Sequence, residues 1–172
     1  MWWTKGWTVR GVALVAAMGG ALQLAPGPAR VNPPVTPSHT LQGATQVPRH
    51  VDAMLRRACL DCHSNETRWP WYSYVAPMSW VVVNDITRAR KAMNLSEWGP
   101  RTEKRPAAAV GQLTAICAGV KQDRMPLPQY VLIHPESRLT PADKQALCEW
   151  TAAEITRTME RRRKTLVTHN AR

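Results

Sequence analysis

The chain has 172 residues and a formal net charge of +11. This length fits one domain with a leader and a tail, because roughly 120 residues remain for a core once those segments are set aside. The positive charge favours anionic partners, either lipid headgroups or an acidic protein. Nucleic acid is a poor candidate, because the N-terminal segment indicates export.

Residues 1–29 have the features of an export segment. Lys5 and Arg10 form a basic region, and an apolar run from Gly11 to Ala25 follows. We expect a signal peptide or an N-terminal membrane anchor. We favour the uncleaved anchor, because three tryptophans could extend the apolar run at a membrane interface: Trp2, Trp3 and Trp7. In either case the body of the protein is expected on the periplasmic side of the inner membrane.

Residues 30–48 form a Pro-rich linker in this interpretation. Prolines such as Pro33, Pro34 and Pro37 disfavour helix and favour extended polyproline conformation. The linker is therefore expected to hold the following domain, residues 49–160, at some distance from the membrane. A short helix from Val51 to Ala58 is expected to open that domain.

The five residues from Cys59 to His63 have the C-x-x-C-H spacing of c-type haem attachment. Two intervening residues let one tight turn present both sulfurs to one porphyrin edge, where each thiol adds to a vinyl group. His63 then follows directly as the proximal axial ligand of the iron. The sequence therefore predicts one covalently bound haem c on Cys59, Cys62 and His63.

Two cysteines at this spacing can also bind zinc, form a redox dithiol or remain structural thiols. A zinc site would need two more ligands, and Cys117 and Cys148 stand alone and far apart. A redox dithiol of the thioredoxin kind belongs in a βαβ pattern, which the sequence lacks. Haem attachment is therefore the preferred interpretation, with the other three roles kept as alternatives.

The residues after the motif supply candidate walls for a flat cofactor. The chain has eight tryptophans and no phenylalanine, and Trp69, Trp71 and Tyr72 lie in one polar and aromatic loop. Large aromatic rings suit packing against a porphyrin, although ordinary core anchoring explains each of them equally well. Arg90, at the edge of a predicted helix over residues 77–93, could neutralise a haem propionate. A solvated position is the preferred interpretation for that arginine.

Met125 is the leading candidate for the second axial ligand. It lies in the segment Arg124-Met125-Pro126-Leu127-Pro128, which follows a helix predicted over residues 106–120. Proline restricts the backbone around the methionine, so the loop loses little conformational freedom when the thioether binds iron. A methionine that merely fills a core gap is the alternative. His134 is the competing ligand and would give a lower reduction potential.

The last helix is expected to begin with Thr140 as its N-cap and Asp143 completing a capping box. Its inward face is expected to carry Leu147, Cys148, Thr151, Ala152, Ile155 and Met159. Cys117 and Cys148 both fall on apolar stripes, so in an oxidising compartment we expect a disulfide between them. Residues 161–172 are expected to form a basic C-terminal tail, either a lipid or protein docking segment or a solvated helix end.

With these residues in view, the chain resembles the bacterial haem-binding domain family of small exported c-type-cytochrome-like proteins. The resemblance is most specific from Cys59 to Trp80. Weaker matches follow at Asp85, Arg90, Asn94, Ser96, Trp98, Ile116-Cys117, Met125-Pro126-Leu127, Tyr130, His134-Pro135 and Cys148-Glu149-Trp150. The family implies covalent haem and an N-terminal anchor or signal, and it implies no particular physiological reaction.

These observations together predict an all-α fold, with about four short helices around one haem in a cytochrome c-like arrangement. The expected function is one-electron transfer in the periplasm with His63 and Met125 as axial ligands. The alternative is a haem enzyme or sensor with an open sixth position that acts on peroxide or a diatomic gas. A third possibility is a haemless, disulfide-stapled interaction module.

Overall fold

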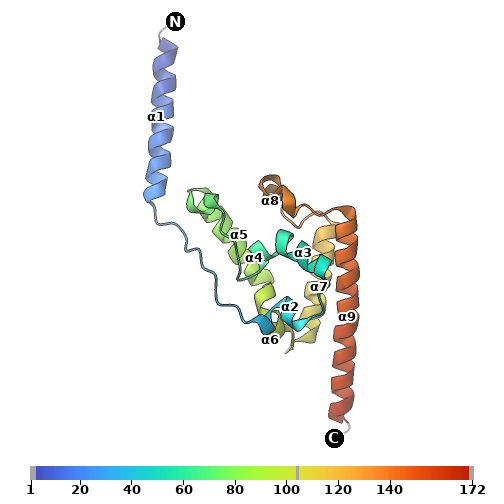
Figure 1. The fold of residues 1–172 in the computed structure, drawn as a ribbon. Coiled ribbons are helices and arrows are strands. Elements are labelled where there is room, and N and C mark those ends of the chain that lie inside the picture. The colour runs from blue at the N-terminus through green and yellow to red at the C-terminus, as the bar shows by residue number, and fades with distance from the viewer. Residues whose placement is uncertain (1–2, 104, 171–172) are drawn as a thin grey trace. The chain divides into compact units, whose positions relative to one another are not determined.

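The computed structural model describes residues 3–103 and 105–170, and the regular elements in these ranges are all helical (Figure 1). The all-α prediction is confirmed for this part of the chain. The chain divides into two compact units, one formed by residues 1–31 and 68–88 and the other by residues 32–67 and 89–172. Each unit is described by itself below.

The first unit contains α1 (Trp3–Leu24), the 3-10 helix η2 (Trp71–Tyr74) and most of α5 (Met78–Ala92). The Gln23 side chain exchanges two hydrogen bonds of 3.1 Å with the backbone of Ala76. No helix in the described ranges combines the length and apolar character that crossing a bilayer requires. Of the tryptophans expected at a membrane interface, Trp2 lies outside the described residues.

The second unit packs its helices around one apolar core. Leu55, Leu113 and Leu147 are fully buried there, and they come from three different helices. The longest helices of this unit, α7 (Pro106–Lys121) and α9 (Pro141–Asn170), run side by side (Figure 1). The other elements, besides the end of α5, are η1 (Pro37–His39), α2 (Leu41–Ala44), α3 (Arg49–Ala58), α4 (Leu60–His63), η3 (Leu95–Glu97), α6 (Trp98–Glu103), α8 (Pro128–Ile133) and η4 (Pro135–Ser137).

Two segments expected to be irregular are partly helical. The prediction of extended chain is wrong for residues 37–44, where η1 and α2 form, because Leu41 is fully buried in the core and Thr40 caps α2 by accepting a hydrogen bond from the Gly43 N–H. The stretch between α5 and α7 likewise contains η3 and α6, with Trp98 only 2% exposed. In both cases burial of one large apolar side chain outweighs the local turn signals.

The start of α9 agrees with the sequence prediction, and its end agrees with one of the two alternatives. The Asp143 N–H donates to Thr140 Oγ1 at 3.1 Å, and the Thr140 N–H donates to Asp143 Oδ2 at 2.9 Å, which is a capping box. The backbone hydrogen bond from Thr140 also lowers the pKa of Asp143. Residues 161–170 of the expected basic tail are helical, because α9 continues through them, which agrees with the alternative of a helix end; Arg172 lies outside the described residues.

The inward face of α9 is shorter than predicted. Ala152 and Met159 are exposed, whereas Glu154 is fully buried. Helices α7 and α9 are antiparallel, since a disulfide joins the end of one to the beginning of the other. Counting equally along both helices from that disulfide brings Pro106, the first residue of α7, opposite Met159. Beyond Met159, α9 is therefore no longer covered by α7.

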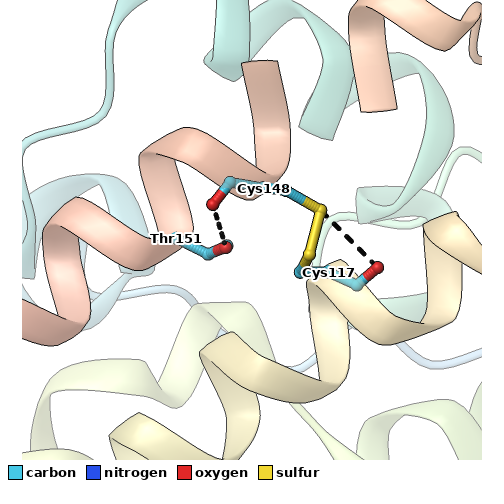
Figure 2. The surroundings of a disulfide bond; sticks show 3 residues. All are labelled: Cys117, Cys148 and Thr151. Atoms are coloured by element: carbon cyan, nitrogen blue, oxygen red, sulfur yellow. Dashed lines mark hydrogen bonds between the residues drawn. A yellow bond between two sulfur atoms is a disulfide. The ribbon is translucent and has the colours of Figure 1, made fainter. Parts of the chain in front are cut away.

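Cys117 of α7 and Cys148 of α9 form that disulfide, with a Cα–Cα distance of 4.8 Å (Figure 2). This is the pairing that the sequence predicts. Its two residues come from neighbouring helices and are 31 positions apart in the chain. The bond therefore ties α9, which carries Asp143 and Leu147, to the helix that precedes the Met125 loop.

Replacing both cysteines, Cys117→Ala with Cys148→Ala, should lower the free energy of unfolding by about 4 kcal/mol, because the crosslink restricts the unfolded chain over this loop length. Urea unfolding of the two proteins under non-reducing conditions measures the difference. As a control, a reducing agent should weaken the native protein and leave the double variant unchanged. Equal unfolding midpoints without reductant would contradict the prediction.

Candidate haem-binding site

The Cys59–His63 motif directly follows α3, with Cys59 at the junction and the other four residues forming the single-turn helix α4. The Cys59 N–H donates to Leu55 O at 2.9 Å and so closes α3. The Cys59 carbonyl then accepts from the Cys62 N–H at 3.2 Å and from the His63 N–H at 2.9 Å. Both cysteines are half-buried, and neither is in a disulfide. A single backbone carbonyl thus holds both sulfurs and the imidazole on one turn of chain.

The imidazole of His63 is oriented by a backbone carbonyl. Its Nδ1 lies 3.0 Å from Met93 O, and since a carbonyl only accepts, Nδ1 carries the hydrogen. Nε2 is then left with its lone pair directed away from this bond. Burial lowers the pKa of His63, which also favours the neutral ring. A neutral histidine with Nδ1–H bonded to a carbonyl is the usual form of a metal-ligating histidine.

The thiol of Cys59 has the opposite character from that of a redox-active cysteine. Burial raises the pKa of Cys59 to about 12, the charge of a Cys62 thiolate raises it further, and Arg57 lowers it. Catalytic dithiols have a depressed pKa, because the thiolate is their nucleophile. Burial therefore favours the neutral thiol of Cys59, and this environment does not favour Cys59 as the nucleophile of a redox dithiol.

The zinc alternative also lacks ligands. Cys117 and Cys148 are joined to each other, so neither is available beside Cys59 and Cys62. Within the described ranges no three His, Cys, Asp or Glu side chains gather as a metal site would require. A zinc site built from the four cysteines is therefore excluded by the fold.

A buried polar network connects the residues after His63 to those after Met93. The Asn65 N–H donates to Ser96 Oγ at 3.0 Å, and Asn94 Nδ2 donates to Asn65 Oδ1 at 2.8 Å. The Ser96 N–H in turn donates to Asn94 Oδ1 at 3.0 Å. All three side chains are at most 5% exposed. The network therefore fixes the chain on both sides of the bond between His63 and the Met93 carbonyl.

Arg90 braces the same segment. Its Nε donates to Ser64 O at 2.7 Å, and its Nη2 donates to Asn32 Oδ1 at 2.9 Å and to Thr67 Oγ1 at 2.8 Å. The side chain is half-buried, so the solvated position preferred at the sequence level is wrong. A role at a haem propionate stays a prediction. The structure shows Arg90 holding the chain that follows the motif.

Helix α8 is connected to the motif by a side-chain hydrogen bond. Tyr130 Oη donates to Asp61 Oδ2 at 3.0 Å, and Asp61 is one of the two residues between the cysteines. The Tyr130 ring stacks on His134 at a centroid distance of 4.4 Å, and His134 Nδ1 lies 3.2 Å from Glu136 Oε1. Sequence reasoning missed α8, because a six-residue helix after a proline carries almost no periodicity.

Met125 lies in the loop between α7 and α8. Its N–H donates to Gly119 O at 3.1 Å, and its side chain lies beside Gly119, where an added methyl group would be in ordinary van der Waals contact with Met125 Cβ and Cγ at 3.5 Å. The residue is 41% exposed. The loop is thus fixed at one end to α7 and at the other, through Tyr130, to the motif. Both the Met125 and the His134 ligand assignments stay predictions.

The three aromatic candidates, Trp69, Trp71 and Tyr72, belong to the first unit. Trp71 is 77% exposed and lies edge-on to Tyr72, with ring centroids 5.8 Å apart. Trp69 and Tyr72 are half-buried. Their assignment to the haem wall stays a prediction.

A family model described as the haem-binding domain matches residues 17–153, which is most of the chain and includes the motif, Met125 and both disulfide cysteines. The chain belongs to the haem-binding domain family. Membership supports haem as the cofactor and agrees with the resemblance seen in the sequence. No curated protein and no solved structure matches the chain.

Proposed function

We propose that this haem-binding domain protein holds one covalent haem c and transfers single electrons. The observation that carries the proposal is the orientation of His63, whose Nδ1 donates to Met93 O at 3.0 Å directly after two cysteines on the same turn. This arrangement leaves Nε2 as a ligand and two thiols beside it for attachment. Bound haem would supply a one-electron Fe(III)/Fe(II) couple.

Attachment of haem to the two cysteines requires no oxidant or reductant. The thiols of Cys59 and Cys62 would each add across one vinyl double bond of the haem, with Sγ bonding to one carbon and the thiol hydrogen moving to the neighbouring carbon. No electrons are gained or lost overall. The reaction needs reduced thiols, and neither cysteine is in a disulfide. His63, fixed by the Met93 carbonyl, serves as the proximal ligand.

Met125 is the sixth ligand in this proposal. Its loop is tethered to Gly119 on α7 and, through Tyr130, to Asp61 between the cysteines. Because the loop is tethered, it would lose little conformational freedom if the thioether bound the iron, which supports Met125 as the ligand. Methionine as the partner of histidine raises the reduction potential, which suits an electron carrier.

The variant Met125→Ala tests this ligand in holoprotein made with a cytochrome c maturation system. The native oxidised protein should show a weak methionine–iron charge-transfer band at the red end of its spectrum, and the variant should lose it entirely. The reduction potential should fall as well if water or histidine takes the position. The matched control, His134→Ala, should keep the band. Retention of the band in Met125→Ala would contradict the assignment, and a native protein without the band whose low-spin spectrum is lost only in His134→Ala would assign the position to His134.

We infer the alternative from the sequence alone: an open sixth position would suit a haem enzyme or sensor for peroxide or a diatomic gas. Carbon monoxide added to the reduced native protein distinguishes the two functions. A rapid shift of the Soret band supports the open site, and an unchanged spectrum supports the electron carrier.

We also propose a periplasmic location, with residues 1–29 as signal peptide or membrane anchor. Covalent attachment of haem c takes place after export, and Lys5 and Arg10 beside an apolar run are typical of an export segment. The net charge of +11 suits an acidic redox partner, since opposite charges speed association.

A further inference from the structure

A cleft of about 460 Å³ lies in the second unit, lined by residues outside the haem motif. One wall is the end of α9, and the other is formed by η1, α2, α6 and the beginning of α7. The residues of the first wall are Thr158, Arg161, Arg162, Thr165 and Leu166; those of the second are Ser38, Ala44, Thr45, Trp98, Gly99, Thr102, Pro106 and Ala109. The α9 wall lies beyond the part of the chain that the family model matches.

The α9 wall is one continuous face of the helix. Thr158, Arg161, Arg162 and Thr165 follow the spacing i, i+3, i+4 and i+7, which places them on one side. If α9 simply extended beyond the core without a further role, its cationic side chains could lie on any side of the helix. Here two arginines and two threonines line the same cleft. The guanidinium groups supply the hydrogen-bond donors, since the Thr165 hydroxyl donates to Arg161 O at 3.1 Å and the Thr158 hydroxyl accepts from Arg161 Nη2.

A buried carboxylate beneath this face holds two arginine side chains in position. Glu154 is fully buried, with Oε2 2.7 Å from Arg157 Nε and Oε1 2.8 Å from Arg161 Nη2. Arg161 Nη2 also donates to Thr158 Oγ1 at 3.1 Å. One carboxylate thus orients two arginines and compensates only one of them. With Arg162 added, the wall keeps a clear excess of positive charge.

The opposite wall is mainly apolar or uncharged. Trp98 and Ala109 are buried and present carbon atoms, while Thr45 and Thr102 add hydroxyl groups. The volume falls in the range of sites for small organic ligands. A ligand that matches both walls has an oxyanion at one end and an apolar body at the other. Guanidinium pairs suit carboxylate and phosphate oxygens in particular.

We propose that this cleft binds an oxyanion carried on an apolar body, such as the phosphate of a lipid or of a soluble organic phosphate. The oxyanion lies against Arg161 and Arg162, and the apolar body lies against Trp98 and Ala109. The site is independent of the haem motif and of the electron-transfer proposal.

The first experiment is a titration of the full-length holoprotein with dihexanoyl-phosphatidylglycerol below its micellar concentration, followed by Trp fluorescence. Saturable 1:1 binding is expected for the native protein. Arg162→Ala should weaken it about tenfold, the usual effect of losing one charge-assisted hydrogen bond. Arg163→Ala removes the same charge from the next residue, which does not line the cleft, and should change the affinity less than about twofold.

A third variant tests the cavity and not the charge. Ala44→Leu puts a larger side chain into the cleft, and it should weaken binding while leaving the net charge unchanged. Inorganic phosphate should bind far more weakly than the lipid, because it lacks the apolar body. Circular dichroism of each variant verifies that the helices are intact.

Two results would overturn the proposal. One is the absence of saturable binding to the native protein. The other is an equal loss in Arg162→Ala and Arg163→Ala, which would indicate general charge attraction. Phosphatidylglycerol vesicles then identify the source of the ligand. Vesicle binding that depends on Arg162 indicates a membrane lipid, and vesicle binding equal in all variants alongside Arg162-dependent lipid monomer binding indicates a soluble ligand.

Discussion

Replacing Cys59 and Cys62 together with alanine should abolish covalent haem, so that the denatured protein shows no haem stain on a gel. Each thioether needs one thiol, and Cys117 and Cys148 cannot substitute because they are joined to each other. Each single variant, Cys59→Ala or Cys62→Ala, should keep at most one thioether. Its pyridine haemochrome band should move toward that of a haem with one vinyl group intact.

The matched control is the variant that lacks the disulfide, Cys117→Ala with Cys148→Ala. It also removes two cysteines, and it should retain full haem staining when grown at a temperature at which it folds. Equal staining of the Cys59/Cys62 double variant and the native protein would contradict covalent attachment at this motif. Loss of staining in the control alone would move the attachment to the other pair.

The parts of the fold that the sequence predicts correctly rest on local patterns. The motif occupies five consecutive residues, so its turn follows from short-range geometry. Helices α3, α5 and α7 appear close to their predicted bounds because their apolar residues repeat at helical spacing. The capping box at Thr140 and Asp143 is likewise set by residues three positions apart.

The parts that the sequence does not reveal depend on distant neighbours. Leu41 lies in a Pro-rich stretch, and only the core formed by later helices explains its burial. Glu154 is buried at a position where an apolar residue is the usual choice, and its partners Arg157 and Arg161 compensate the charge within the same helix. Local pattern reasoning assigns such residues to loops and surfaces, because it cannot see what covers them.

The candidate site also combines features set by local sequence with features that depend on distant residues. The identity of the proximal ligand follows from the motif, but its orientation depends on Met93, thirty residues further on. The carbonyl of Met93 is held by chain on either side, including Arg90 with its bond to Ser64 O and Asn94 with its bonds to Asn65 and Ser96. The polar residues of the family resemblance at these positions therefore have a structural role, since they hold the Met93 carbonyl that orients His63.

Asn94→Ala tests that role, and it should lower the free energy of unfolding by about 2 kcal/mol. The side chain is 5% exposed, and its loss leaves the buried Asn65 Oδ1 and the Ser96 N–H without these partners. The Met93 carbonyl should shift with the loosened turn and weaken its bond to His63 Nδ1. A histidine with a weaker second bond is a poorer electron donor to iron, so the reduction potential should rise.

Urea unfolding and redox titration of the holoprotein measure the two effects. Asn84→Ala is the matched control, because Asn84 is exposed in the first unit and its loss should change the free energy of unfolding by less than about 0.5 kcal/mol. A purely structural role for Asn94 predicts lower stability with an unchanged reduction potential. The link between the network and His63 requires both quantities to change, and an unchanged potential in a folded Asn94→Ala protein would refute it.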